Sequence, residues 1–122
     1  MKERTIERWK FLAWQALSRK KRSIGYCQKC GKKNVKLEAH HLITKAHGNY
    51  AKFEEDNIVA LCYYCHRIFF HGNSTWDEER DFIEKLIGLD RYWEMKRKSS
   101  ETVKYTAEDY AGMIEGWTDE IS

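Results

Sequence analysis

Four cysteines in the 122-residue chain fall into two identical pairs, and each pair has two residues between its thiols. This spacing lets one tight turn present both sulfurs to the same ion, and two such turns make the closed tetrahedral site that structural zinc takes. Disulfide formation is the alternative. The N-terminus argues against it because it lacks the apolar core of a secretion signal, which leads us to expect a cytoplasmic protein. Cysteines stay reduced in the cytoplasm, so disulfides are rare there. We therefore predict a structural zinc ion held by Cys27, Cys30, Cys62 and Cys65.

The residues around the second cysteine pair and ahead of it carry further groups that could do chemistry. His40 and His41 end an expected strand, Asn57 stands just before the next strand, and His66 directly follows the last cysteine. Side chains alternate along a strand, so the two adjacent histidines should point to opposite sides. One can then bind a metal while the other takes a proton from water, which suits hydrolysis of a phosphodiester. Taken singly, Asn57 could cap a turn and His66 could be an extra zinc ligand.

The order Cys27-x-x-Cys30, His40-His41, Asn57, Cys62-x-x-Cys65-His66 resembles the HNH endonuclease family in its zinc-clamped form. The stretch AHHLITKAHGNYAKFEEDNIVALCYYCH is similar to that family's strand–loop–strand–helix, the ββα-metal finger. The resemblance is close over residues 26–72. The flanking helices resemble small phage and prophage HNH proteins in a general way.

This resemblance implies a role for each matching residue. His41 would be the general base that activates water, and Asn57 would orient that histidine and brace its loop. His40 and His66 would hold one divalent ion, Mg²⁺ or Mn²⁺, with His66 completing the catalytic set. The ion would polarise the scissile phosphate and stabilise the leaving 3′ oxygen. Cleavage by this family leaves a 5′ phosphate and a 3′ hydroxyl.

The chain departs from the family pattern after the last signature histidine, where many members carry a lysine that meets phosphate. Here the sequence reads His66-Arg-Ile-Phe-Phe-His71. We take Arg67, His71 and Lys45 as the candidate phosphate or DNA contacts. His71 lies about 140° from His66 around an α-helix. It would reach the site only if that helix ended or bent, which Gly72 permits.

Charge divides the chain into a basic front and an acidic rear. Residues 1–52 hold 14 Lys and Arg against three Glu, whereas residues 53–122 hold eight Lys and Arg against 16 Asp and Glu. A basic surface is either merely solvated or directed at a polyanion such as nucleic acid. With the histidine pattern, it indicates DNA as the partner, bound in a strongly salt-dependent way.

Hydrophobic periodicity and capping residues predict the elements that position these groups. We expect helices at 2–22, 63–71, from the Ser74-Thr75 cap to about 87, at 89–98 and at 107–116, with strands at 35–40 and 58–61 and a loop at 42–56. The predicted fold class is α+β: a ββα-metal finger with a four-cysteine zinc site, flanked by N- and C-terminal helices. The expected divisions of one nuclease domain over 1–122 are a basic helix (1–25), the zinc-clamped core (26–72) and C-terminal helices (73–122).

The sequence thus favours a metal-dependent HNH endonuclease acting on DNA. The alternatives are a non-catalytic, zinc-stabilised nucleic-acid-binding module and a phage assembly or packaging factor.

No apolar run reaches the roughly 20 residues that a membrane helix needs. We expect a cytoplasmic protein of phage or prophage origin, monomeric or weakly dimeric, with a phage terminase or another phage or host protein as a further partner. A neutral histidine base predicts a rate that rises through about pH 6.5 and then levels off.

Overall fold

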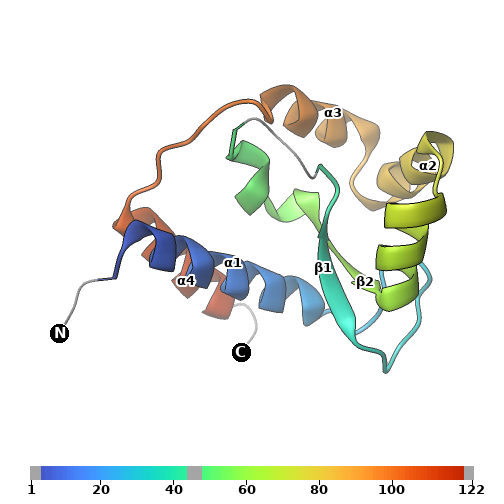
Figure 1. Cartoon of the computed structure of the whole chain (residues 1–122), viewed down its shortest axis with the longest axis horizontal. Coiled ribbons are helices and arrows are strands. Elements are labelled where there is room, and N and C mark those ends of the chain that lie inside the picture. Colours follow the sequence, from blue (N-terminus) through green and yellow to red (C-terminus); the bar gives the residue numbers. More distant parts are fainter. Residues whose placement is uncertain (1–3, 44–47, 120–122) are drawn as a thin grey trace.

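The computed structural model describes residues 4–43 and 48–119 of the chain. Its elements run in the order α1 (Ile6–Arg22), β1 (Leu37–His41), η1 (Tyr50–Phe53), η2 (Glu55–Asn57), β2 (Ile58–Cys62), η3 (Tyr64–Asn73), α2 (Trp76–Leu86), α3 (Leu89–Lys98) and α4 (Ala107–Asp119) (Figure 1). This mixed α+β arrangement, with a small antiparallel sheet and flanking helices, confirms the predicted fold class.

The sheet consists of β1 and β2, which pair antiparallel with Leu37 opposite Cys62 and His41 opposite Ile58. The register places a cysteine of the second pair at one end of the hairpin and a histidine at the other. Every residue of β2 is buried, because α1 packs on the hairpin and η3 follows it closely. An unbroken apolar run such as Ile-Val-Ala-Leu suits a strand without a solvent face.

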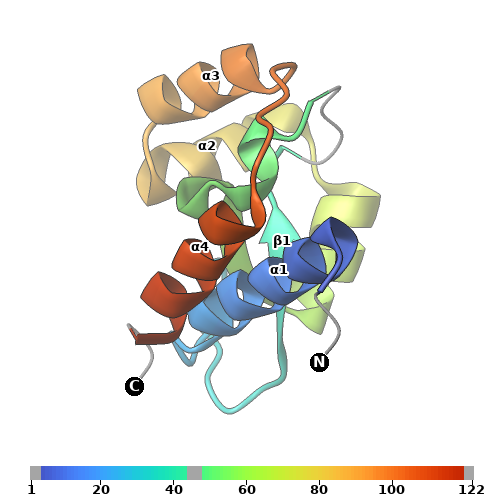
Figure 2. The ribbon, with the colours of Figure 1, turned by 90° about the vertical axis from the view of Figure 1, so that its left-hand side faces the viewer.

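Helix α1 packs along α4, and the two lie side by side in both views (Figures 1 and 2). Thr5 caps α1 by accepting a hydrogen bond from the Arg8 amide at 3.1 Å. Ala13, Ala16 and Leu17 face inward and form a core with residues of η1, β2 and α4, completed by Phe53, Ile58, Tyr110 and Trp117. The long N-terminal helix is therefore held to the hairpin by apolar packing.

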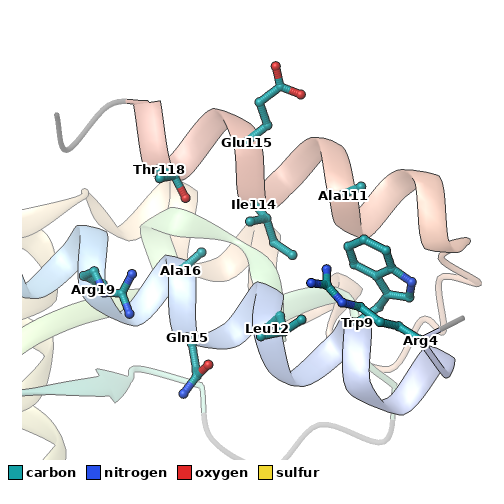
Figure 3. Close-up of a pocket in the computed structure, with 10 residues that line it drawn as sticks. All are labelled: Arg4, Trp9, Leu12, Gln15, Ala16, Arg19, Ala111, Ile114, Glu115 and Thr118. Atoms are coloured by element: carbon teal, nitrogen blue, oxygen red, sulfur yellow. The ribbon is translucent and has the colours of Figure 1, made fainter. Parts of the chain in front are cut away.

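A groove of about 490 Å³ remains between α1 and α4 (Figure 3). Its walls combine apolar side chains such as Trp9 and Ile114 with the charged groups of Arg4, Arg19 and Glu115. None of the predicted site residues lines this groove.

The capping patterns read from the sequence hold in the structure. Thr75 caps α2 and accepts from the Glu78 amide at 3.3 Å. Thr106 and Asp109 exchange side-chain-to-amide hydrogen bonds of 2.8 and 3.1 Å at the start of α4. Such reciprocal caps satisfy amides that have no partner within the helix.

Several predicted boundaries were wrong. The first strand occupies 37–41 instead of 35–40, and α4 continues to Asp119 instead of ending near 116. Part of the expected loop at 42–56 forms the short helices η1 and η2. The helix expected over 63–71 runs over 64–73 and has π-helical hydrogen bonding. Within the described ranges, no helix is long and apolar enough to cross a membrane.

Candidate metal centre and active site

The four cysteines converge at the end of the hairpin. One sulfur from each of Cys27, Cys30, Cys62 and Cys65 lies within 4.8 Å of the others. None of them forms a disulfide, and the Sγ atoms of Cys30 and Cys62 are 3.8 Å apart. Tetrahedral zinc with bonds of about 2.3 Å places two sulfurs about 3.8 Å apart. The donor set and its spacing therefore fit a structural zinc ion.

The first cysteine turn is built by local backbone geometry and fastened to the sheet. The Gly31 amide donates to the Cys27 carbonyl at 2.8 Å, and Gly31 has a φ of +79°, in the left-handed region that glycine adopts readily. Gln28 pairs with Ala60 of β2 twice, with its amide donating at 2.9 Å and its side-chain oxygen accepting at 2.8 Å. These bonds hold the first turn against the strand that leads into the second pair.

The same turn prepares a thiolate. Burial acts to raise the pKa of the Cys27 thiol, but hydrogen bonds from the backbone at Cys30, Cys62 and Lys29 outweigh it and lower that pKa to about 6. Burial and the neighbouring thiols raise the pKa of Cys65. A metal ligand must be a thiolate, so ion binding at this cluster would release protons.

A second cluster forms where β1 faces η3. Nitrogens of His40, His66 and His71 all lie within 4.8 Å of one another, and the ring centroids are 5.0 to 5.4 Å apart. His40 is buried, whereas His66 is half-buried and His71 is exposed. Three convergent imidazoles can hold one transition-metal ion.

The winding of η3 explains why His71 joins this cluster without a bend at Gly72. Residues 64–73 follow i to i+5 hydrogen bonding, and the Ser74 amide continues the pattern by donating to the Phe69 carbonyl at 2.9 Å. A π-helix winds more widely than an α-helix, so residues five apart lie nearly above one another. The requirement for a bend assumed α-helical geometry and was wrong.

Glu38 is a site residue that the sequence reasoning missed. Its carboxylate accepts a hydrogen bond from Nδ1 of His66 at 2.9 Å, which leaves Nε2 of that ring free to bind an ion. The bond from His66, followed by those from Arg67, lowers the pKa of the Glu38 carboxyl. The available signal was strand alternation, since positions 38 and 40 share one face of β1.

Arg67 lies beside the same carboxylate. Its guanidinium donates to Glu38 at 3.2 and 3.4 Å while its side chain stays 55% exposed. Lys45, the other basic residue expected near phosphate, lies outside the described residues, as does His47.

The buried His40 is held neutral. Burial first, and then the nearby rings of His66, His71 and His41, lower the pKa of His40 to about 3. A neutral imidazole keeps the lone pair that a metal requires. His40 is therefore in a protonation state that can bind a metal ion.

His41 makes its contacts with a different part of the molecule. Its ring stacks on Trp14 of α1, with centroids 4.7 Å apart and planes 18° apart. Its Nε2 lies 3.2 Å from the Lys52 carbonyl oxygen. A carbonyl can only accept, so Nε2 carries the proton and Nδ1 keeps a lone pair. Burial lowers the pKa of His41 below its usual value, so the ring is neutral at pH 7.

Asn57 braces η1, the short helix that supplies this carbonyl. Its side chain is fully buried and accepts from the Ile43 amide at 2.8 Å. Its amide group donates to the carbonyls of Ile43 at 3.2 Å and Ala51 at 3.0 Å. Asn57 therefore ties Ile43 to Ala51, next to the Lys52 carbonyl that His41 contacts.

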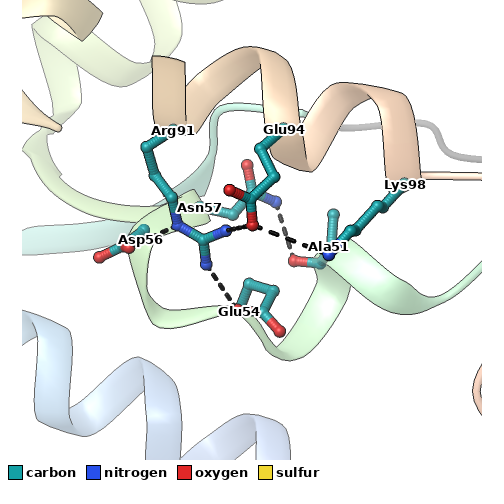
Figure 4. Close-up of polar contacts among 7 residues, drawn as sticks. All are labelled: Ala51, Glu54, Asp56, Asn57, Arg91, Glu94 and Lys98. Carbon is teal, nitrogen blue, oxygen red and sulfur yellow. Dashed lines mark hydrogen bonds and ion pairs between the residues drawn. The ribbon is translucent and has the colours of Figure 1, made fainter. Parts of the chain in front are cut away.

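Helix α3 holds the same turn from outside (Figure 4). The guanidinium of Arg91 binds Glu54 and Asp56, each at 2.8 Å, and Glu94 of its own helix at 3.0 Å. Asp56 directly precedes Asn57. A residue of the C-terminal helices thus ties down the turn that positions the buried asparagine.

The loop is also joined to the chain between α3 and α4. Asn49 donates to the Val103 carbonyl at 2.8 Å and accepts from the Val103 amide at 2.6 Å. The backbone passes so close that a Cβ at Gly48 would lie 1.9 Å from the Glu101 carbonyl oxygen. Only glycine fits at that position.

The structure therefore brings the predicted residues together as two groups. His40, His66 and His71 share one cluster, while His41 lies against α1 and the loop that Asn57 braces. Residues 27–68 match the family model described as HNH endonuclease. No curated protein and no solved structure matches the chain.

Proposed function

We propose that this chain is an HNH endonuclease, in line with the family match of residues 27–68, and that it hydrolyses DNA phosphodiester bonds with the help of a divalent metal ion. The observation that carries the proposal is the cluster of His40, His66 and His71, with Glu38 bonded to the far nitrogen of His66 at 2.9 Å. Metal-binding histidines characteristically donate their other ring N–H to a carboxylate in this way.

The donor set fits a metal ion at this cluster. When bound by the three imidazoles, a divalent ion would polarise the scissile phosphate and stabilise the leaving 3′ oxygen. Imidazole is a weak ligand for Mg²⁺ and a good one for later transition metals. Of the two ions expected from the sequence, the histidines favour Mn²⁺ over Mg²⁺, and they would accept Co²⁺, Ni²⁺ or Zn²⁺ still more readily.

His41 is the proposed general base. Its Nδ1 lone pair takes a proton from the attacking water while Nε2–H continues to donate to the Lys52 carbonyl. That hydrogen bond fixes the ring and stabilises the imidazolium that forms. Asn57 contributes by holding the loop in place. Because burial keeps the pKa of His41 low, the base is in its working form at neutral pH.

The proposal extends to the zinc ligands, the DNA contacts and the number of strands that one molecule cuts. The four cysteines hold zinc, and Arg67 and Lys45 contact DNA phosphate. The whole of 1–122 acts as one nuclease domain in the cytoplasm, of phage or prophage origin and with a terminase or similar protein as partner. One active site cuts one strand, so a monomer nicks DNA and a pair of sites is needed to cut both strands.

A plasmid cleavage assay tests the proposal. Zinc-loaded protein is desalted and incubated with supercoiled plasmid in the presence of Mg²⁺, Mn²⁺, Co²⁺ or Ni²⁺, beside the His41→Ala and His66→Ala variants. Arg80→Ala, on the exposed face of α2, is the matched control. We expect relaxed circles from the wild type and the control only. Plasmid that is shifted on a gel but stays supercoiled with every metal would instead support a non-catalytic binding module.

A further inference from the structure

A hollow of about 400 Å³ opens beside His41. Lys10 of α1 and Lys52 of η1 contribute to its walls, together with backbone and side chains of the loop around Gly48 and Asn49. A smaller hollow of about 220 Å³ shares the same two lysines and also reaches Glu7 and Trp14. The two lysines therefore line the same hollow as His41, the proposed base.

The charges around this space do not balance. Within residues 4–43 and 48–119, neither Lys10 nor Lys52 forms an ion pair with a carboxylate. Burial, and then the nearby ammonium of Lys10, lower the pKa of Lys52, while Glu7 acts in the opposite direction. Both lysines line the same two hollows, and Glu7, which lines the smaller hollow with them, forms no ion pair with either lysine within the described residues. An anion between them would relieve the repulsion.

We propose that Lys10 and Lys52 hold one backbone phosphate of the DNA, next to the phosphate that is cut. That this phosphate belongs to DNA rests on the proposed function, since the substrate of a DNA nuclease carries phosphates along its whole length. The three clustered histidines do not line this hollow, which is why the ligand is a neighbouring phosphate and not the scissile one.

Lys10 lies outside the residues that match the family model. The basic helix α1 therefore supplies part of the substrate site, and its packing on the hairpin through Ala13 and Leu17 sets the distance between the lysines and His41. In this arrangement α1 aligns the DNA backbone with the base.

The first test is the salt dependence of DNA binding. It uses a short duplex and protein that carries His66→Ala, which removes a proposed metal ligand outside this hollow, so that no cleavage can interfere. Loss of one phosphate contact lowers the slope of log K against log salt by about 0.9. We expect about this decrease for Lys10→Met with Lys52→Met combined, and not twice as much, because both lysines serve one phosphate. Lys104→Met, an exposed lysine between α3 and α4, should leave the slope unchanged.

The second test is stability without DNA. Lys10→Met keeps the aliphatic stem and removes the repulsion, so the melting temperature should stay the same or rise. Lys20→Met on the same helix is the matched comparison and should lower it, because Lys20 forms an ion pair with Glu55. Weaker DNA binding combined with unchanged or higher stability is the expected result for a binding lysine.

An unchanged salt slope in the double variant would overturn the proposal, as would a Lys10→Met melting temperature that falls as far as that of Lys20→Met. Inorganic phosphate is titrated separately as a probe. Phosphate binding that needs both lysines, without any change in the DNA slope, would overturn the assignment to DNA. These measurements use a variant that cannot cut, so the plasmid assay can fail while this proposal stands, and the reverse.

Discussion

Replacing Asn57 with alanine should remove the side chain that ties Ile43 to Ala51. The side chain makes three hydrogen bonds in a position that is fully buried. The Ala51 carbonyl would keep a second partner, because it also accepts from the Glu54 amide at 3.3 Å. The amide and the carbonyl of Ile43 would both lose the bond that Asn57 supplies.

The expected loss follows from that count. An unsatisfied buried polar group costs about 1 to 3 kcal/mol, so two such groups lower the free energy of unfolding by about 3 kcal/mol or more. Small domains have only about 5 to 15 kcal/mol in total. At this chain length, 3 kcal/mol corresponds to a fall in melting temperature of roughly 12 °C. Cleavage should be lost as well, because the Lys52 carbonyl no longer fixes His41.

Urea unfolding of the zinc-loaded protein measures the effect. Asn49→Ala is the matched control in the same loop, since it also removes two bonds, but from a half-buried side chain that water can replace. We expect that variant to lose only about 1 kcal/mol. A loss below 1 kcal/mol for Asn57→Ala, or one no larger than that of Asn49→Ala, would refute the bracing role.

Three further predictions concern the two candidate metal centres and the proposed base. Glu38→Gln should weaken metal binding at the histidine cluster by roughly 10- to 100-fold in calorimetric titration, because the carboxylate orients His66; an unchanged affinity would contradict this. The rate of plasmid cleavage should rise to a plateau with a mid-point below pH 6.5, because burial lowers the pKa of His41 and the base must be neutral to take a proton. A mid-point above pH 6.5 would exclude His41 as the base. Removing zinc with a chelator, or Cys27→Ser, should abolish cooperative thermal unfolding of the core, because structural zinc binding is coupled to folding. A thermal transition that stays unchanged when the measured zinc content is zero would rule out the structural ion.

Much of the site was readable from the sequence because its signals are local. Two-residue spacing between cysteines encodes a turn, and both pairs do meet in one cluster. Capping residues marked the starts of α2 and α4 correctly. The alternation of a strand anticipated that His40 and His41 have different surroundings, which the contacts with Phe70 and Trp14 show.

Other features depend on which elements pack together, and they could not be read in advance. Glu38 meets His66 across 28 positions, and Arg91 meets Glu54 across 37. The position of His71 depended on whether η3 wound as an α- or a π-helix, and the residue types did not distinguish the two.

The sequence by itself therefore determined the residue types, the turns, the four-cysteine set and two of the three histidines that cluster, His40 and His66. The tertiary structure decided which carboxylate supports a histidine, which carbonyl selects the tautomer of His41 and which lysines stand beside it. The physical reason is that periodicity and capping act within a few residues of the chain. Charge pairs and hydrogen bonds between elements depend on distances that only packing sets.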